Sequence, residues 1–232
     1  MKIYIEANIG AGKTTFIKLL KNKLKNNKNY SFILEPVEEW KNKYKNNDGK
    51  NILDLFYNNV TRWSYTFQMT AWMTRIRSIH KEIQNKKNNI FFIERSIYTD
   101  KNCFANLCYN NGLMEKIEWE LYNDCFSLLE NTIDVKADVY IYLFLEPEKC
   151  LERIQKRKRK EESNITLEYL KQLHQKHEIW MEKNVKNGIK VIKINVEEDF
   201  EDDEIIFLQH FSKIFNNIGN IKSERIKISS IK

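Results

Sequence analysis

Short apolar runs recur along the chain between longer stretches in which apolar residues return every three or four positions. The short runs are rich in β-branched and aromatic residues and predict buried strands, whereas the longer spacing predicts helices. The predicted strands are 2–5, 31–34, 90–93, 138–145 and 190–194. The predicted helices are 14–25, 52 to about 84 in one or two pieces, a helix that opens with Pro147, and 200–215. Strands alternating with helices predict an α/β domain.

The first predicted strand leads directly into a glycine-containing turn and then a helix. The turn matches GxxxxGK[ST], and in this strand–turn–helix context the pattern indicates a nucleotide-binding loop. Backbone N–H groups and the positive end of the helix would bind a polyphosphate, with Lys13 reaching the β- and γ-phosphates and Thr14 helping to hold Mg²⁺. The predicted phosphate-binding residues are Asn8, Ile9, Gly10, Ala11, Gly12, Lys13, Thr14 and Thr15.

One position departs from this pattern, because Ala7 stands where the first glycine is expected. Alanine costs little if the residue has a negative φ angle and more if the loop needs a positive one. The alternative interpretation is an ordinary strand-to-helix turn. The intact Gly12-Lys13-Thr14 and the flanking elements favour the phosphate-binding loop.

Size and composition limit the remaining possibilities. A chain of 232 residues, 42% of them hydrophobic, is long enough for one sizeable α/β domain, which we place at 1–215, with a tail at 216–232 of unknown role. The net charge of +7 invites a nucleic-acid interpretation. However, many lysines lie among asparagines in the apparent loops 21–28 and 41–50, as on a solvated surface. We therefore expect no nucleic-acid partner.

The cysteines and the hydropathy pattern bear on the compartment. The four cysteines form no CxxC pair and have no histidine at zinc-ligand spacing, which predicts free thiols in a reducing compartment. No apolar stretch has membrane-spanning length, and no signal-peptide pattern opens the chain. We expect a cytoplasmic protein that does not bind membranes.

Charged residues follow two of the predicted strands. Glu35 follows the strand 31–34, and Glu94-Arg95-Ser96 follows the strand 90–93. Ligands of parallel α/β sheets collect at the carboxyl ends of the strands, which is the edge that carries the phosphate loop. A lone glutamate at such a place is more often a surface residue, but an adjacent acid and base suit metal or phosphate chemistry.

Two further groups of polar residues can be interpreted either as ordinary solvent-exposed surface or as functional sites. Gln68, Ala71 and Arg75 share one helical face beside Phe67 and could contact a flat heterocycle, or they could be the polar face of an amphipathic helix. The basic residues of 153–160 could be a solvated charge run or a lid that closes on phosphate. In the second case Arg153 and Arg157, one helical turn apart, could both reach a transferring phosphoryl group.

Taken together, these stretches resemble the deoxynucleoside kinases, the family that includes deoxycytidine and deoxyguanosine kinases. The resemblance covers about residues 3–215, with the motifs in the family's order. The matching stretches are 5–15, Glu35-Pro36-Val37 with Trp40, Trp63-Ser64-Tyr65-Thr66-Phe67-Gln68, Arg75-Ile76-Arg77, Glu94-Arg95-Ser96-Ile97-Tyr98-Thr99-Asp100, 157–162, and Leu167-Glu168-Tyr169-Leu170 with Leu173-His174.

The resemblance implies a P-loop kinase fold, with a five-stranded parallel sheet flanked by helices and an arginine-rich lid. It implies ATP-dependent phosphorylation of a deoxynucleoside 5′-hydroxyl with Mg²⁺, nucleotide salvage, and usually a homodimer. The implied catalytic residues are Glu35 as general base, Arg95 as its neighbour, and Arg153, Arg157 and Arg159 on the moving phosphoryl group. Glu94 would join Thr14 at the metal, and Tyr57 and Glu162 would bind the sugar 3′-hydroxyl.

The resemblance also assigns a base pocket. Gln68 would bond to the edge of the base, Phe67 and Phe104 would stack on its faces, and Trp40 would wall the pocket. Three further positions, Ala71, Arg75 and Asp100, decide between branches of the family. An Arg–Asp pair fills the space of a thymine methyl group, so we predict deoxycytidine, deoxyadenosine or deoxyguanosine in preference to thymidine. Glu198, Asp199 and Phe200 match the family's stretch near the base of the phosphate donor.

Two other functions compete with this interpretation. A thymidylate-kinase-like nucleoside monophosphate kinase shares the phosphate loop and an arginine-rich lid, but needs extra cations for the acceptor phosphate. A non-catalytic nucleic-acid-binding P-loop module would explain the basic charge, and it predicts salt-sensitive binding. It leaves Glu35, Gln68 and Glu162 without a role.

Overall fold

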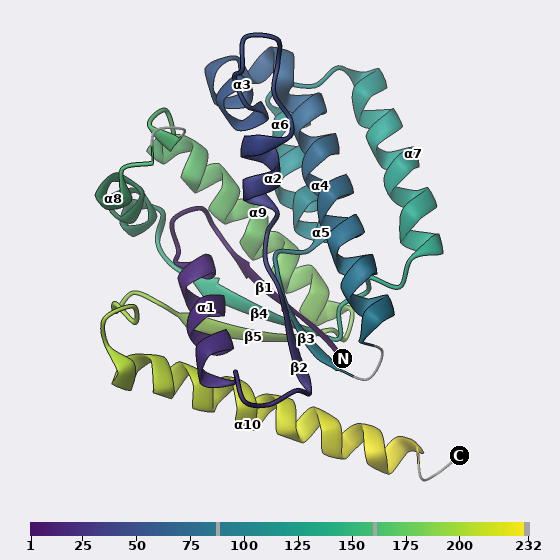
Figure 1. The fold of residues 1–232 in the computed structure, drawn as a ribbon, viewed down its shortest axis with the longest axis vertical. Helices are drawn as coiled ribbons and strands as arrows, with labels where there is room; N and C mark the ends of the chain where they lie inside the picture. The colour runs from purple at the N-terminus through teal and green to yellow at the C-terminus, as the bar shows by residue number, and fades with distance from the viewer. Residues whose placement is uncertain (87–88, 160–161, 230–232) are drawn as a thin grey trace.

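The computed structural model describes the backbone of residues 1–86, 89–159 and 162–229, and the side chains in these ranges up to residue 219. A central sheet lies between two layers of helices (Figure 1). Its strands are β1 (Lys2–Ala7), β2 (Tyr30–Ile33), β3 (Ile90–Glu94), β4 (Val139–Phe144) and β5 (Lys190–Asn195). All neighbouring strands are parallel, in the order β2-β3-β1-β4-β5. The predicted α/β class and the five parallel strands are confirmed.

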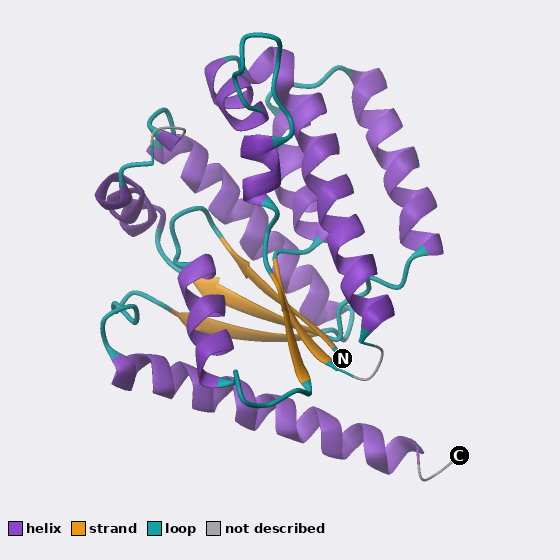
Figure 2. Ribbon diagram, viewed as in Figure 1, coloured by secondary structure: helices purple, strands orange, loops and turns teal. Residues whose placement is uncertain are grey.

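Helices fill the connections between the strands (Figure 2). They are α1 (Lys13–Lys23), α2 (Val37–Asn42), α3 (Ile52–Asn58), α4 (Val60–Asn85), α5 (Ile97–Thr99), the π-helical turn η1 (Asp100–Ala105), α6 (Asn106–Asn110), α7 (Lys116–Thr132), α8 (Pro147–Arg157), α9 (Leu167–Lys186) and α10 (Glu204–Ser229). The region predicted as helical from residue 52 is two helices, α3 and α4. The hydrophobic pattern did not identify α7 or α9.

The sheet separates two hydrophobic cores. Successive side chains of a strand point to opposite faces, so β1 contributes Tyr4 to one core and Ile3 and Ile5 to the other. The first core is closed by α4, α7 and α9, and the second by α1 and α10. Burial on both faces explains why the strands read as continuous apolar runs rather than alternating ones.

The last helix differs from its prediction at both ends. It begins at Glu204 because the Asp203 carboxylate accepts the N–H groups of Ile205 and Ile206, at 2.8 and 3.1 Å, and caps it. Phe200 lies before the helix and packs edge-on against Phe16. At the other end, α10 runs through the proposed tail boundary to Ser229, with Ile218 buried beyond it. Residues 230–232 of that tail lie outside the described residues.

The order of the strands places a binding site at one edge of the sheet. The chain moves from β1 to β2 and β3 on one side, then to β4 and β5 on the other. Parallel sheets bind ligands at the carboxyl end of the strand where this order switches. The loop after β1 lies there, and the segments after β2 and β3 end at the same edge. Among the described residues, no helix has the length and apolar character needed to cross a membrane.

Candidate active site

A cavity of about 410 Å³ opens at this edge of the sheet. Its walls come from the loop after β1, from α1, α2, α3, α4 and η1, from the segment between the end of α8 and the start of α9, and from Glu201 after β5. Most residues singled out from the sequence line it, although they come from distant parts of the chain. They are Asn8, Ile9, Gly10, Gly12, Lys13, Thr14, Thr15, Glu35, Trp40, Tyr57, Phe67, Gln68, Ala71, Arg75, Arg95, Asp100, Phe104, Arg157, Arg159 and Glu162.

The loop after β1 has the backbone of a phosphate-binding turn. Gly10 and Gly12 adopt left-handed φ angles of 85° and 87°, and a Cβ atom on Gly10 would lie 2.4 Å from the Cys150 carbonyl oxygen. Ala7 is the buried last residue of β1 and does not have a positive φ angle. The position that departs from the sequence pattern therefore requires no glycine.

Lys13, Thr14 and Glu94 meet beneath this loop. The Lys13 Nζ atom lies 2.9 Å from Glu94 Oε1, and the Thr14 hydroxyl donates to the same oxygen at 2.5 Å. Burial alone would raise the pKa of Glu94, but the charge of Lys13 and the hydrogen bonds from Thr14 and Lys13 together outweigh it and lower the pKa. A hydroxyl and a carboxylate are hard oxygen ligands that suit Mg²⁺. Within the described residues, no three His, Cys, Asp or Glu side chains are placed to hold a metal ion together. Phosphate oxygens of a bound nucleotide could supply further ligands at Thr14 and Glu94.

Three cations surround Glu35. Its Oε1 atom accepts a hydrogen bond from Arg75 Nη2 at 2.8 Å and lies 3.5 Å from Arg95 Nε, and its Oε2 atom is 3.6 Å from Lys13 Nζ. Burial opposes ionisation, but the charges of Lys13, Arg75 and Arg95 outweigh it and hold the pKa of Glu35 well below its usual range. Arg95 is the neighbour of Glu35 that the family resemblance implied, and Arg75 is a second one, whose nitrogen is closer.

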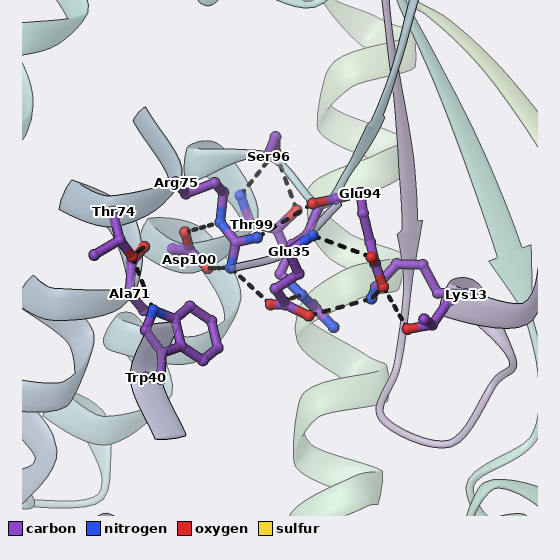
Figure 3. A network of polar contacts seen from close by, with 12 residues as sticks. Lys13, Glu35, Trp40, Ala71, Thr74, Arg75, Glu94, Ser96, Thr99 and Asp100 are labelled. Atoms are coloured by element: carbon purple, nitrogen blue, oxygen red, sulfur yellow. Dashed lines mark hydrogen bonds and ion pairs between the residues drawn. The ribbon is translucent and has the colours of Figure 1, made fainter. Parts of the chain in front are cut away.

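Arg75 links two parts of the cavity, as Figure 3 shows. Its Nε and Nη2 atoms donate to the two oxygens of Asp100 at 2.7 and 3.1 Å, and Nη2 also donates to Glu35. Its Nη1 atom donates to the Glu94 carbonyl oxygen at 3.2 Å. Both Arg75 and Asp100 are 2% exposed. The predicted Arg–Asp pair is therefore a buried bidentate ion pair that also contacts the glutamate Glu35.

Aromatic side chains form the apolar part of the cavity. The Trp40 indole N–H donates to the Thr74 hydroxyl at 2.8 Å, and its ring meets Phe67 edge-on at 5.6 Å. Phe56 stacks on Phe67 at 4.6 Å. Gln68 is 1% exposed, and its amide nitrogen donates to Cys108 Sγ at 3.9 Å. Sequence reasoning did not identify every lining residue; those missed are Lys18, Val37, Lys41, Leu53, Phe56, Tyr169 and Glu201. The apolar ones lie on helix faces that read as ordinary core positions.

The predicted lid residues occupy two different places. Arg157 Nε donates to Glu162 Oε2 at 2.7 Å, and Arg159 Nη1 lies 3.6 Å from Glu162 Oε1, all at the cavity. Arg153 instead donates to the carbonyl oxygens after β5, at 2.9 Å for Val196. Lys160 and Glu161 lie outside the described residues.

The residues predicted near the donor base lie beside the phosphate loop rather than in the cavity. Phe200 is buried close to Gly12, where an added Cβ atom would come within 2.8 Å of its ring. Glu198 and Asp199 are exposed beside it. Any nucleotide bound by the loop would therefore have this segment at its side.

A buried histidine supports the wall of the cavity. His177 is fully buried, donates from Nδ1 to the Leu173 carbonyl oxygen at 2.7 Å, stacks on Tyr142 and meets Phe104 edge-on. Burial, aided by the charge of Arg95, lowers the pKa of His177 to about 3. The imidazole is therefore neutral in the folded protein at neutral pH.

This pKa predicts acid sensitivity. The unfolded chain takes up a proton on His177 below about pH 6.5 and the folded chain does not, so stability falls with falling pH. As the pH falls from about 6.5 to about 5, protonation of His177 in the unfolded chain should lower the free energy of unfolding by about 1.5 kcal/mol. Urea titrations of the wild type and His177→Gln across this range would measure it. Equal slopes in the two proteins would contradict the prediction.

Comparison with known proteins gives consistent matches over nearly the whole chain. A family model described as deoxynucleoside kinase matches residues 3–221. Deoxycytidine kinase 2 of Gallus gallus is 39% identical over 228 residues, covering 88% of this chain and 85% of the relative. A probable deoxycytidine kinase of fowlpox virus (strain NVSL) is 36% identical, covering 96% and 88%. A mitochondrial deoxyguanosine kinase of Xenopus laevis is 36% identical, covering 87% and 83%.

Proposed function

This chain belongs to the deoxynucleoside kinase family, and we propose that it phosphorylates the 5′-hydroxyl of deoxycytidine or a deoxypurine nucleoside in preference to thymidine. ATP is the phosphate donor in this proposal, and the reaction serves nucleotide salvage. The observation that carries the base preference is the buried Arg75–Asp100 pair, which shares one cavity with Gln68 and the phosphate loop. The names of the similar proteins, deoxycytidine and deoxyguanosine kinases, support the same preference.

Glu35 is the general base of the proposed reaction. It lines the cavity with 16% of its side chain exposed, so a 5′-hydroxyl can reach it. Its low pKa keeps it ionised but makes it a weak base, so it would take the hydroxyl proton as the O–P bond forms and that proton becomes acidic. Arg95, 3.5 Å from Glu35, would contact the same substrate oxygen.

The phosphates are bound by the opposite end of the cavity. The N–H groups of the loop after β1 and the ammonium of Lys13 would hold the donor, and Arg157 and Arg159 would face the transferred group. Thr14 and Glu94 would hold Mg²⁺, which neutralises charge on the phosphates when bound. Arg153, which holds the segment after β5, would act on phosphate only after leaving its carbonyl partners.

The nucleoside occupies the aromatic end. Gln68 would bond to the edge of the base, while Phe67 and Phe104 stack on its faces and Trp40 closes the wall. Tyr57 and Glu162 would bind the 3′-hydroxyl, and both line the cavity. Burial, with a contribution from the charge of Glu162, raises the pKa of Tyr57, which supports a neutral hydroxyl donor at this place.

The base preference follows from volume and charge. Arg75 and Asp100 are paired and buried on the same side of the cavity as Ala71. In this proposal their side chains would fill space that the 5-methyl group of thymine needs. They also offer charged hydrogen-bonding groups to the amino and ring-nitrogen edges of cytosine and purines. Removing Arg75 alone would leave Asp100 buried without its cation, so the test removes both.

The test compares deoxycytidine, deoxyadenosine, deoxyguanosine and thymidine side by side with ATP. We expect the wild type to use thymidine worst. In Arg75→Met/Asp100→Ala, the ratio of kcat/KM for thymidine to that for deoxycytidine should rise about tenfold or more, because the pocket gains room and loses its charges. Total activity should fall, since Arg75 also contacts Glu35. Thymidine as the best wild-type substrate would overturn the base preference.

Two further arms separate the rival functions. Deoxynucleoside monophosphates test the thymidylate-kinase-like alternative, which requires cations for a second phosphate. Salt-dependent binding of a single-stranded oligonucleotide, without phosphate transfer, would favour the nucleic-acid-binding module. Transfer to nucleosides alone supports the proposal.

We also propose that the protein forms a homodimer through α4 and α7. These helices pack side by side at the outer edge of the molecule (Figure 1). Ile117, Leu121 and Leu128 form an exposed apolar stripe on α7, with 66%, 48% and 67% exposure, and Met73 on α4 is 42% exposed. An exposed apolar face of this kind favours burial against a second copy.

The dimer predicts a specific effect of a charge on the stripe. Leu121→Glu should convert the protein to a monomer in sedimentation equilibrium, because it would bury two carboxylates across a two-fold axis. Ile179→Glu, at a 57% exposed position on α9, is the matched control and should leave the dimer intact. A wild type that sediments as a monomer would exclude the interface.

A further inference from the structure

A second glutamate, Glu6, lies inside the sheet close to the catalytic arginine Arg95. It is on the central strand β1 and is 0% exposed. A buried carboxylate is costly unless other groups bond to it. Burial raises the pKa of Glu6 above its usual value, although the charge of Arg95 and the polar groups of Ser96 and Thr99 act in the opposite direction. The groups that favour the charged form of Glu6 therefore belong to the segment that follows β3.

Arg95 is the corner at which the chain leaves β3 and enters α5. Its φ angle is +64°, in the left-handed region that residues other than glycine, asparagine and aspartate rarely adopt. Such a conformation costs on the order of 1 kcal/mol and persists only when neighbouring contacts hold it. Lys158 is the other non-glycine residue with a positive φ angle in the part of the chain described.

The strand β1 accepts hydrogen bonds from two consecutive N–H groups at this corner. The N–H group of Arg95 donates to the Ile5 carbonyl oxygen at 3.0 Å, as expected for neighbouring parallel strands. The next N–H group, that of Ser96, donates to Glu6 Oε1 at 2.8 Å. The second bond takes the place of a strand partner, since β3 has ended. A side chain of β1 thus fixes the peptide unit that follows the strained residue.

At this corner the Arg95 side chain points toward Glu35 and Phe104, at the end of the cavity where the nucleoside would bind. The guanidinium lies 4.4 Å from the centre of the Phe104 ring, and its Nε atom is 3.5 Å from Glu35. Its Nη1 atom is buried and has no hydrogen-bond partner among the described residues. Arg95 lines the cavity, and a guanidinium nitrogen without a protein partner is a donor that a substrate oxygen could use.

We propose that Glu6 is a positioning residue that acts on phosphate transfer through Arg95. Its carboxylate accepts the Ser96 N–H group, keeps Arg95 in the left-handed conformation and so places the guanidinium beside Glu35 and Phe104. This inference rests on the proposed function, because Arg95 is given its role there. According to this inference, phosphate transfer also requires the buried carboxylate of Glu6, which belongs neither to the phosphate loop nor to the base pocket.

Two substitutions separate the acceptor from the volume of the side chain. Glu6→Gln keeps an oxygen that can accept from Ser96, whereas Glu6→Leu keeps the volume and loses the acceptor. We expect Glu6→Leu to lower kcat about ten- to a hundredfold, since small misplacements of catalytic groups have effects of this size. KM for ATP should not change, and Glu6→Gln should retain kcat within about threefold. Loss of melting temperature with kcat per folded molecule unchanged would show a structural role only and overturn the proposal.

A double-mutant cycle tests whether Arg95 carries the effect. In an Arg95→Gln background, Glu6→Leu should change kcat by less than about twofold, because residues that act as a unit are not additive. Additive losses would overturn the proposal.

A crystal structure of Glu6→Leu tests the conformation of Arg95 independently of enzyme activity. Arg95 should leave the left-handed region or move away from Glu35, and an unchanged corner would exclude the inference even if the enzyme is a nucleoside kinase. Absence of transfer in the wild type would instead refute the proposed function.

Discussion

Glu35→Gln is expected to lower kcat for deoxycytidine by about 10²- to 10⁴-fold, the usual contribution of a general base. The substitution keeps the size of the side chain and its ability to accept hydrogen bonds, but removes the basic oxygen. Arg75, Arg95 and Lys13 would then face a neutral amide. The attacking hydroxyl would have no group of suitable basicity at that end of the cavity. Single-turnover phosphorylation with ATP measures the chemical step directly.

Glu38→Gln is the matched control for this substitution. Glu38 is an exposed residue of α2, three positions beyond Glu35. Its substitution by glutamine changes the net charge of the protein by the same amount as Glu35→Gln. We expect its activity to equal that of the wild type. The dissociation constant of deoxycytidine for Glu35→Gln, measured by equilibrium dialysis, should change little, because the proposed stacking and Gln68 contacts to the base lie elsewhere in the cavity. A Glu35→Gln enzyme with near-normal kcat would refute the role of Glu35.

Lys13→Met is expected to lower kcat/KM by about 10²- to 10³-fold, as for removal of a fixed charge that faces the transition state. Lys13 is 7% exposed and lies between Glu94 and Glu35, at 2.9 and 3.6 Å. Without its charge, Glu94 and Glu35 lose a shared cation, so the pKa of each should rise. The variant should therefore also lose stability above the pKa of these groups.

The control for this prediction is Lys18→Met, on the same helix α1. Lys18 also lines the cavity but is exposed to solvent. We expect at most a small rise in KM for ATP, because an exposed charge is screened by water and salt. Steady-state kinetics with varied ATP compares the two variants. Equal effects of Lys13→Met and Lys18→Met would mean that general positive charge, rather than the loop lysine, binds the donor.

Much of the fold could be predicted because its signals are local. Each strand of the sheet is a short apolar run that is recognisable without its neighbours, and the phosphate loop has a fixed spacing of glycine, lysine and threonine. Helix limits were harder to predict, as α10 shows. Its start depends on the Asp203 cap and its continuation on the burial of Ile218. Burial depends on what packs against a residue, which no local pattern contains.

The site divides in the same way. Glu35, Glu94 and Arg95 could be placed at one sheet edge because they directly follow strands, and parallel strands end together. The bond from Arg75 to Glu35 could not be predicted, because those residues are 40 positions apart on different elements. Phe56 was missed for a related reason. An apolar residue on a helix looks the same whether it faces a core or a cavity.

The sequence by itself determined the strands, the phosphate loop and the residue types available for chemistry, since these depend on neighbours within a few positions. Only the tertiary structure decided that Arg75 joins Asp100 to Glu35 and that Arg153 holds the segment after β5. It alone shows Glu6 bonded to the strained corner at Arg95. These contacts join segments far apart in the chain, and their geometry is set by the packing of the sheet and helices rather than by any local preference.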